Sequence, residues 1–220
     1  MTLEKIFLLR PIDIVRCFHN AFRLDMSQID TSMLNIAREG GDLALIFDRL
    51  QIVTEILDYH ARGEEAAVFP AVDNIAPLVA KAYIMDHREL DNMVQGLEAI
   101  RKAPDPLTAA RATAVLNSHL RIHLDKEDAH LYPILGERTT DDEQVSIVRN
   151  MASKTPPERI PTQFQWLLPL LDFEDQVKVT RLFMSIMPPP VFTTVKPLIK
   201  KSVSANWVML TEQIPELSDK

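Results

Sequence analysis

One pattern of residues that could carry out chemistry occurs twice in this chain of 220 residues. The stretch HARGEEAAVFP runs from His60 to Pro70, and HLDKEDAHLYP runs from His123 to Pro133. Both fit the pattern His-x-x-x-Glu-acid-Ala-x-aliphatic-aromatic-Pro. Residues four apart are neighbours on a helix surface, so a helix would place each histidine beside the glutamate of its own stretch. Each stretch then offers one imidazole and one carboxylate on the same helix face.

Such a pair needs a chemical reason if it faces the interior of the protein. Burying an ionisable group is costly unless the group is paired or binds a metal ion. A lone histidine is more often an ordinary core or surface residue than a metal ligand. Several histidines at one level, beside paired carboxylates, reverse that expectation. The positions of the other histidines therefore decide whether this is a site.

Long helices must position these residues. The chain has only five glycines and little β-branched alternation, which favours helices throughout. Glycine and proline breaks separate four helical stretches, expected at Pro11 to Arg38, Asp42 to Phe69, Pro77 to Lys102 and Leu107 to Leu135. Short connections between long helices predict an all-α fold with an antiparallel up-down four-helix bundle.

In such a bundle, residues equally far from a turn lie at the same height. His19 and His60 are equally far from the Gly40–Gly41 break, and the next two breaks relate His87 in the same way to both repeated stretches. One layer of the bundle is therefore expected to hold His19, His60, Glu64, His87, His123 and Glu127. The repeated stretches then form two walls of one site.

Four imidazoles and two carboxylates at one height suit a pair of metal ions, with the carboxylates bridging them. Mixed nitrogen and oxygen ligands favour iron, or less often manganese, over the sulfur-rich sites of structural zinc. Two-metal sites hold their ions about 3.5–4 Å apart, which a carboxylate can bridge. These ligands therefore suit a pair of iron ions best, with manganese and zinc as the alternatives, but they do not identify the metal.

This set of residues resembles the hemerythrin-like (HHE cation-binding) domain. The resemblance covers roughly residues 11 to 136, and the doubled His-x-x-x-Glu with its trailing aromatic-Pro is the specific part. It implies a non-haem di-iron centre that meets O2 or a related small oxidant. Spacing alone indicates a site with several ligands and does not identify iron.

The chain departs from the oxygen-carrying hemerythrins on the third helix, where they have His-x-x-x-His. Here Tyr83 lies four residues before His87, and Asp91 lies four residues after it. Six protein ligands would leave at least about two coordination positions of two six-coordinate ions open. Tyr83, another side chain such as His119, water or substrate could fill them. We therefore expect a site that is more open to chemistry than a dedicated carrier.

Several neighbours of these residues have simpler interpretations. Glu65 and Asp128 follow the glutamates and are expected on a solvated shoulder, although either could orient a ligating imidazole. His130 is expected to face solvent or cap a helix. Cys17 is expected to be a small buried side chain. Phe69 and Tyr132 are expected to pack at the end of the bundle, where each following proline ends its helix.

Composition limits the classes of partner and compartment. The formal net charge of −7, with no basic cluster to offset it, argues against nucleic acid as a partner. No apolar run approaches membrane-spanning length. The single cysteine excludes an internal disulfide framework and fits a reducing compartment. We expect a cytoplasmic location and no membrane partner.

The chain changes character after its four long helical stretches. We divide it into a bundle at residues 1–138 and a helical extension at residues 139–220, which is rich in proline and has no histidine. Helices are expected in the extension at about Asp141 to Ser153, Thr162 to Leu171, Glu174 to Met187 and Phe192 to Gln213. The extension could form a subdomain, a cap over the bundle, or a homodimer interface.

Three functions remain open from the sequence. The first is a di-iron protein that binds or reacts with O2, peroxide or nitric oxide, in sensing, detoxification or storage. The second is a di-iron enzyme with peroxidase-like, catalase-like or oxidase activity, with Tyr83 near the metals. The third is a helical interaction module that the metal stabilises. All three require the same layer of ligands.

Overall fold

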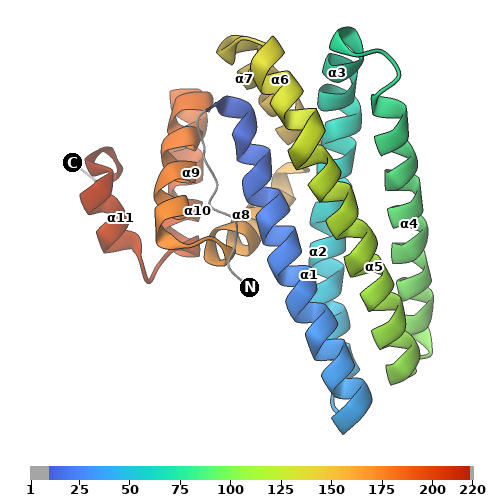
Figure 1. Ribbon diagram of the computed structural model, residues 1–220. Coiled ribbons are helices and arrows are strands. Elements are labelled where there is room, and N and C mark those ends of the chain that lie inside the picture. Colours follow the sequence, from blue (N-terminus) through green and yellow to red (C-terminus); the bar gives the residue numbers. More distant parts are fainter. Residues whose placement is uncertain (1–9, 219–220) are drawn as a thin grey trace.

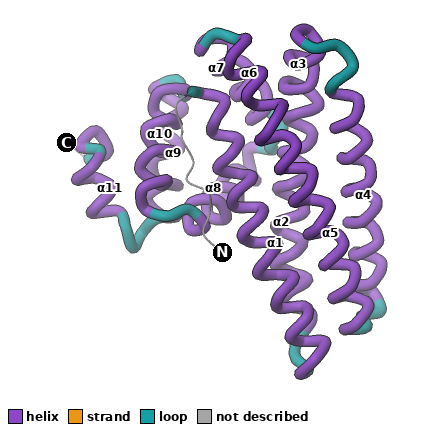
Figure 2. Tube along the Cα trace, in the orientation of Figure 1, coloured by secondary structure: helices purple, strands orange, loops and turns teal. Residues whose placement is uncertain are grey.

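The computed structural model describes residues 10–218, and every regular element within that range is a helix (Figures 1 and 2). The prediction of an all-α fold is confirmed for these residues. The predicted bundle at residues 1–138 and the predicted extension at residues 139–220 also include residues 1–9 and 219–220, which lie outside the described range. The four longest helices are α1 (Ile14–Glu39), α2 (Leu43–Gly63), α4 (Ala80–Lys102) and α5 (Pro106–Lys126).

Local chemistry explains where these helices begin and end. Asp42 and Asp105 cap α2 and α5, because their side chains accept hydrogen bonds at 2.8 Å from the backbone N–H groups of Ala44 and Thr108. Between α1 and α2 the chain turns at Gly40, whose φ of 83° lies in the left-handed region that favours glycine.

The four long helices lie side by side, and successive ones run in opposite directions (Figure 1). On α1 the buried residues Phe22, Met26, Ile29 and Met33 recur every three or four positions, so one stripe of the helix faces the interior. The arrangement is consistent with a four-helix bundle.

The helices of both repeated stretches continue past their prolines, so the expectation that each proline ends its helix is wrong. Glu64–Val68 and Glu127–Leu131 are π-helical, and they are followed by α3 (Phe69–Ile75) and α6 (Tyr132–Arg138). In the first stretch the N–H of Phe69 bonds the carbonyl of Glu64, five residues earlier. Pro70 therefore falls in the first turn of α3, where its missing N–H costs little.

The C-terminal part forms α7 (Asp141–Ala152), α8 (Ile160–Leu167), α9 (Phe173–Ile186), α10 (Pro189–Ser202) and α11 (Trp207–Gln213). Short 3-10 turns lie at Pro11–Asp13, Pro157–Arg159, Leu168–Leu170 and Pro215–Leu217. The single helix expected at Phe192 to Gln213 is interrupted at residues 203–206. This turn brings α11 back toward α9, where Arg181 donates to the carbonyl of Gln213 at 2.6 Å.

Helices α8 and α9 pack against α1, α7 packs against α2, and α10 and α11 pack on the other C-terminal helices. Figure 1 shows α8 to α11 on the side of α1 that faces away from α4 and α5. Trp166 of α8 packs on Phe22 in a tilted arrangement with ring centroids 4.8 Å apart, and its indole N–H donates to the buried carboxylate of Asp25 at 2.7 Å. One continuous set of buried apolar side chains includes residues of both parts. The boundary between residues 138 and 139 stays a prediction. Within residues 10–218, no helix has the length and hydropathy to cross a bilayer.

Helix α7 approaches α2 most closely at Gly63, directly before the first π segment. A Cβ atom at Gly63 would lie 2.4 Å from the Met151 side chain and 3.0 Å from the Met151 carbonyl oxygen. Nearby, the Asn150 side chain donates at 3.4 Å to the carbonyl of Ala66, which Pro70 leaves without its usual partner. Glycine at position 63 therefore allows α7 to cover the π segment.

We predict that Gly63→Ala lowers the free energy of unfolding by about 1–3 kcal/mol, because α7 must move away from α2. Gly96→Ala is the matched control, since nothing lies within 4 Å of a Cβ there. In that helical position alanine should stabilise the protein by about 0.5–1 kcal/mol. Urea unfolding of both variants checks the prediction, and equal effects would contradict it.

Candidate metal centre

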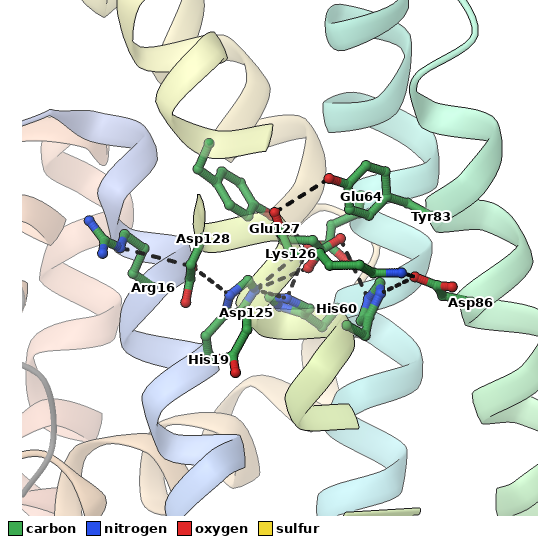
Figure 3. Close-up of polar contacts among 12 residues, drawn as sticks. Arg16, His19, His60, Glu64, Tyr83, Asp86, Asp125, Lys126, Glu127 and Asp128 are labelled. Carbon is green, nitrogen blue, oxygen red and sulfur yellow. Dashed lines mark hydrogen bonds and ion pairs between the residues drawn. The ribbon is translucent and has the colours of Figure 1, made fainter. Parts of the chain in front are cut away.

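The structure brings the six predicted site residues together inside the four long helices. Figure 3 labels His19, His60, Glu64 and Glu127 among them. His19 lies on α1, His60 on α2, His87 on α4 and His123 on α5, and Glu64 and Glu127 begin the π segments that follow α2 and α5. All six side chains are buried, and none of these residues is more than 5% exposed. Residues far apart in the sequence thus form one polar cluster in an apolar interior.

The π segments position the two glutamates. Glu64 and Glu127 are the first residues of their segments, at the point where the helix changes its hydrogen-bond register. Such π turns within α-helices are often found at functional sites. Because the same distortion occurs in both repeats, the two carboxylates enter the cluster in equivalent ways.

The first half of the cluster is formed by His19 and His60. Their Nε2 atoms lie 3.1 Å apart. Glu64 Oε1 is 3.3 Å from His60 Nε2, and Glu127 Oε2 is 3.6 Å from His19 Nε2. This half therefore has two imidazole nitrogens and one oxygen from each carboxylate.

The second half is formed by His87 and His123, with the other oxygen of each carboxylate. His87 Nε2 lies 3.4 Å from Glu64 Oε2, and His123 Nε2 lies 3.5 Å from Glu127 Oε1. One donor atom from each of these four residues lies within 4.8 Å of all the others. Each carboxylate thus spans two neighbouring halves that have the same set of donor atoms.

Several of these atoms have no hydrogen-bond partner among the described residues. They are Glu64 Oε2, His87 Nε2 and both carboxylate oxygens of Glu127. Buried polar atoms are normally satisfied, and leaving one unsatisfied is costly. The nitrogen and oxygen donors are those that divalent iron or manganese accepts. The residues present therefore fit a pair of metal ions.

Three of the four imidazoles are held from behind by an acidic side chain. The Nδ1 atom of His19 bonds Asp128 at 2.9 Å, that of His87 bonds Glu65 at 3.1 Å, and that of His123 bonds Asp86 at 3.3 Å. Asp128 and Asp86 lie on opposite sides of the cluster (Figure 3). Such contacts select the tautomer that directs Nε2 inward.

Each of these acids is in turn paired with a basic side chain. Arg23 donates to Asp128 at 2.7 Å, Arg88 donates to Glu65 at 2.9 Å, and Lys126 bonds Asp86. Beside His60 there is instead an aromatic wall, with the rings of Phe18 and Phe22 at centroid distances of 5.9 and 5.3 Å. The cluster is therefore polar behind three histidines and apolar behind the fourth.

Sequence reasoning left the roles of Glu65 and Asp128 open, and the structure gives both the same role. Glu65 follows Glu64 in the first repeat and contacts His87, whereas Asp128 follows Glu127 in the second repeat and contacts His19. Asp86 was not singled out, although it directly precedes His87 in the sequence. Glu65, Asp128 and Asp86 are each adjacent in the sequence to one of the six site residues. This adjacency is the signal that could have pointed to Asp86.

Tyr132 was expected to pack at the end of the bundle, but its hydroxyl donates a hydrogen bond to Glu64 Oε1. Tyr132 is five residues after Glu127, which is the hydrogen-bond period of a π turn. Phe69 is the equivalent residue of the first repeat, and it packs on His87 with centroids 5.2 Å apart. The two repeats therefore differ by one hydroxyl group at the carboxylates.

The two further candidates lie elsewhere. Tyr83 is buried beside His123, with ring centroids 6.3 Å apart, and its hydroxyl donates to the carbonyl of Lys126 at 3.4 Å. His119 lies on the exposed face of α5 and bonds the Val115 carbonyl at 3.0 Å, because the inward face of α5 passes through Leu116 and Leu120 instead. It does not join the cluster. His130 is exposed and Cys17 is buried, as expected.

The two buried carboxylates have opposite shifts in pKa. Burial raises the pKa of Glu127 well above its usual value, and the nearby charge of Glu64 raises it further. Burial acts in the same direction on Glu64, but the charge of His60 and hydrogen bonds from the imidazoles outweigh it and hold the pKa of Glu64 well below its usual value. Without another positive charge between them, both carboxylates do not ionise together.

The imidazoles differ according to their neighbours. Burial lowers the pKa of His123 to about 4 and also lowers the pKa of His60. Burial opposes protonation of His19 as well, but the charge of Asp128 outweighs it and raises the pKa. Neutral imidazoles are the form that binds metal.

Comparison with known proteins identifies this arrangement. Residues 10–135 match the family described as the hemerythrin HHE cation binding domain. The chain belongs to this family. No solved structure is significantly similar to the chain.

The chain is also similar to part of three larger proteins of Arabidopsis thaliana. Zinc finger protein BRUTUS is 24% identical over 185 residues, which cover 81% of this chain and 15% of that protein. Zinc finger protein BRUTUS-like At1g18910 is 22% identical over 188 residues, with the same coverage. The chain therefore spans about a seventh of the length of these relatives. The similar region covers 81% of the chain, which is more residues than precede position 136. The similarity therefore extends into the C-terminal helices.

A cavity of about 340 Å³ leads to the cluster of this hemerythrin domain between α2, α4 and α5. His60, His87 and His123 line it together with Asp58 and Asp91, which are half-buried. A small molecule can therefore approach the three imidazoles from this side. Asp91 lies one turn after His87 on α4.

We predict that Asp128→Asn destabilises the metal-free protein by about 2 kcal/mol at neutral pH. Burial opposes ionisation of Asp128, but the charges of His19 and Arg23 outweigh it and lower its pKa to about 2. A depressed carboxyl pKa stabilises the fold above the unfolded value, near pH 4, and this contribution disappears as the pH falls toward 2.

Urea unfolding between pH 7 and pH 2 measures this difference. Asp125→Asn is the matched control, because Asp125 contacts the same Arg23 but its side chain is 67% exposed. Its effect should stay below about 1 kcal/mol. A gap between the two variants that does not shrink in acid would contradict the assignment.

Proposed function

We propose that this chain is a non-haem di-iron protein that binds or reacts with O2, peroxide or nitric oxide. His19 and His60 would hold one iron ion, and His87 and His123 the other. Glu64 and Glu127 would bridge the two ions. Manganese and zinc remain the alternative metals, and Cys17 as the single cysteine supports a reducing, cytoplasmic setting.

The observation that carries this proposal is the division of each carboxylate between two pairs of imidazoles. Glu64 directs one oxygen toward His60 and the other toward His87, and Glu127 is divided in the same way between His19 and His123. A site for one ion would not need two equivalent halves. Two cations would also satisfy the unpartnered atoms and allow both carboxylates to ionise.

Iron would supply redox chemistry and open coordination positions, and the residues of the chain would control access and protons. The cavity between α2, α4 and α5 admits a small molecule to three of the imidazoles. The Tyr132 hydroxyl holds a proton at Glu64 Oε1, on the carboxylates themselves. Asp128, Glu65 and Asp86 keep the imidazoles oriented.

The cavity also favours a second candidate function, a di-iron enzyme. Its half-buried Asp58 and Asp91 could exchange protons with a substrate near the imidazoles. Burial raises the pKa of Asp58, which favours its protonated form. Repeated turnover with peroxide would support the enzyme, whereas one adduct per chain would support binding alone.

We predict about two iron atoms per chain after iron-replete expression, the stoichiometry of a bridged two-metal site. His123→Ala should reduce the iron content to about one atom or fewer, because it removes one of four nitrogen donors. His119→Ala is the matched control on the same helix and should retain the full content, since His119 is exposed. Mass spectrometry of metals gives the result. Zinc, a single ion or no metal in the unchanged protein would contradict the proposal.

We also predict that the reduced, iron-loaded protein reacts with at least one of O2, nitric oxide and hydrogen peroxide. The change in its absorption spectrum, followed by stopped flow, measures the reaction. His60→Ala should abolish the response, and His119→Ala should leave it unchanged. A fully iron-loaded protein that responds to none of the three molecules would refute the oxidant chemistry without refuting the metal site.

A further inference from the structure

A second cavity, of about 330 Å³, lies between the bundle and the C-terminal helices. Carbon atoms form nearly all of its lining. Its deep wall includes Val15 of α1, Leu167 of α8, and Phe183 and Ile186 of α9, which are all buried. Protein interiors contain few voids larger than a water molecule, so a cavity of this size has the character of a ligand pocket.

The innermost part of this cavity reaches the cluster of buried histidines and glutamates from the side of His60. His60 lines the cavity together with Phe18, and their ring centroids are 5.9 Å apart. This is the apolar side of the cluster, where His60 has aromatic neighbours in place of an acid. The cavity is therefore separate from the one between α2, α4 and α5, and it lies on another side of the same imidazole.

The outer end of the cavity is formed by exposed residues. Arg149 and Ala152 of α7 lie on one side, and Pro188 and Val191 lie on the other. The Nε atom of Arg149 donates to the Ile186 carbonyl at 2.7 Å, which holds the side chain at this position. Among the described residues, its two terminal nitrogens have no hydrogen bond or ion pair.

We propose that this cavity binds a small amphipathic carboxylate, with its hydrocarbon or aromatic body inside and its carboxylate at Arg149. The volume lies at the lower end of the range for pockets that bind small molecules. The apolar lining has almost no groups that could bind a polar body. A guanidinium group matches the shape and charge of a carboxylate, and it is the charged group that faces this mouth.

The C-terminal helices acquire a role from this assignment, because α8, α9 and α10 supply much of the cavity wall. The ligand would contact His60 and Phe18 but would not replace any of the residues assigned to iron. Binding in this cavity therefore does not depend on which metal the cluster holds.

The test is calorimetric titration of the full chain with decanoate, and with decanol and decylamine as probes of the same length. Decanoate should bind at one saturable site. Decanol should bind about fivefold more weakly, the scale of a partly exposed charged contact, and decylamine more weakly than decanol. Arg149→Gln should reduce decanoate binding to the level of decanol, whereas Arg149→Lys should retain most of the difference.

Ala152→Phe places a ring in the mouth of the cavity and should weaken decanoate binding at least about tenfold, a loss typical of an obstructed apolar pocket. Ser146→Phe adds the same ring at an exposed position of α7 that does not line the cavity, and it should leave binding unchanged. Urea unfolding shows whether each variant folds. Val191→Trp, on the opposite side of the mouth, replaces Ala152→Phe if that variant fails to fold.

Three results would overturn the proposal. They are the absence of saturable decanoate binding, equal binding to the folded Ala152→Phe and Ser146→Phe variants, and binding of decylamine as tight as that of decanoate. Iron content is measured on each variant in parallel. Failure of the carboxylate site with two irons per chain, or the reverse, separates this inference from the di-iron proposal.

Discussion

The burial of two carboxylates side by side is the constraint on which the rest of this structure depends. Glu64 and Glu127 are both buried, and like charges at short distance repel strongly in such an environment. The chain surrounds them with four imidazoles and the Tyr132 hydroxyl. Behind these, three further acids and their basic partners orient the imidazoles. The outer acids hydrogen-bond the imidazoles. Unpartnered atoms of Glu64, His87 and Glu127 remain at the centre, where they can bind cations.

The same constraint explains the distortion of the helices. A regular α-helix cannot continue through Pro70 or Pro133 without losing a hydrogen bond and meeting a steric clash. In both repeats the π segment begins at the buried glutamate and ends just before the aromatic residue and the proline. The change of register therefore serves two purposes. It accommodates the proline, and it turns the glutamate and the residue five positions later toward the same site.

The C-terminal helices contact the residues that surround the central cluster. Helix α7 packs against the first π segment through Gly63, and Trp166 of α8 packs on Phe22, which in turn packs on His60. The similarity to the Arabidopsis thaliana relatives also extends beyond the hemerythrin domain match into this part of the chain. His60 is thus in contact with Phe22, which the C-terminal helices cover. His60 also lines the second cavity.

The helical class, the four long helices and the six residues of the central layer could all be predicted from the order of residues along the chain. This is possible because helix periodicity and the distance of each residue from a turn are local properties of the chain. The neighbours that complete the site depend instead on how the helices pack together. Asp86, Arg23 and Tyr132 reach it through side-chain directions that depend on the packing of other helices and on the π turns. His119 shows the opposite case, since it lies one turn from His123 but faces outward, because the rotation of α5 about its axis is set by contacts with α1 and α4.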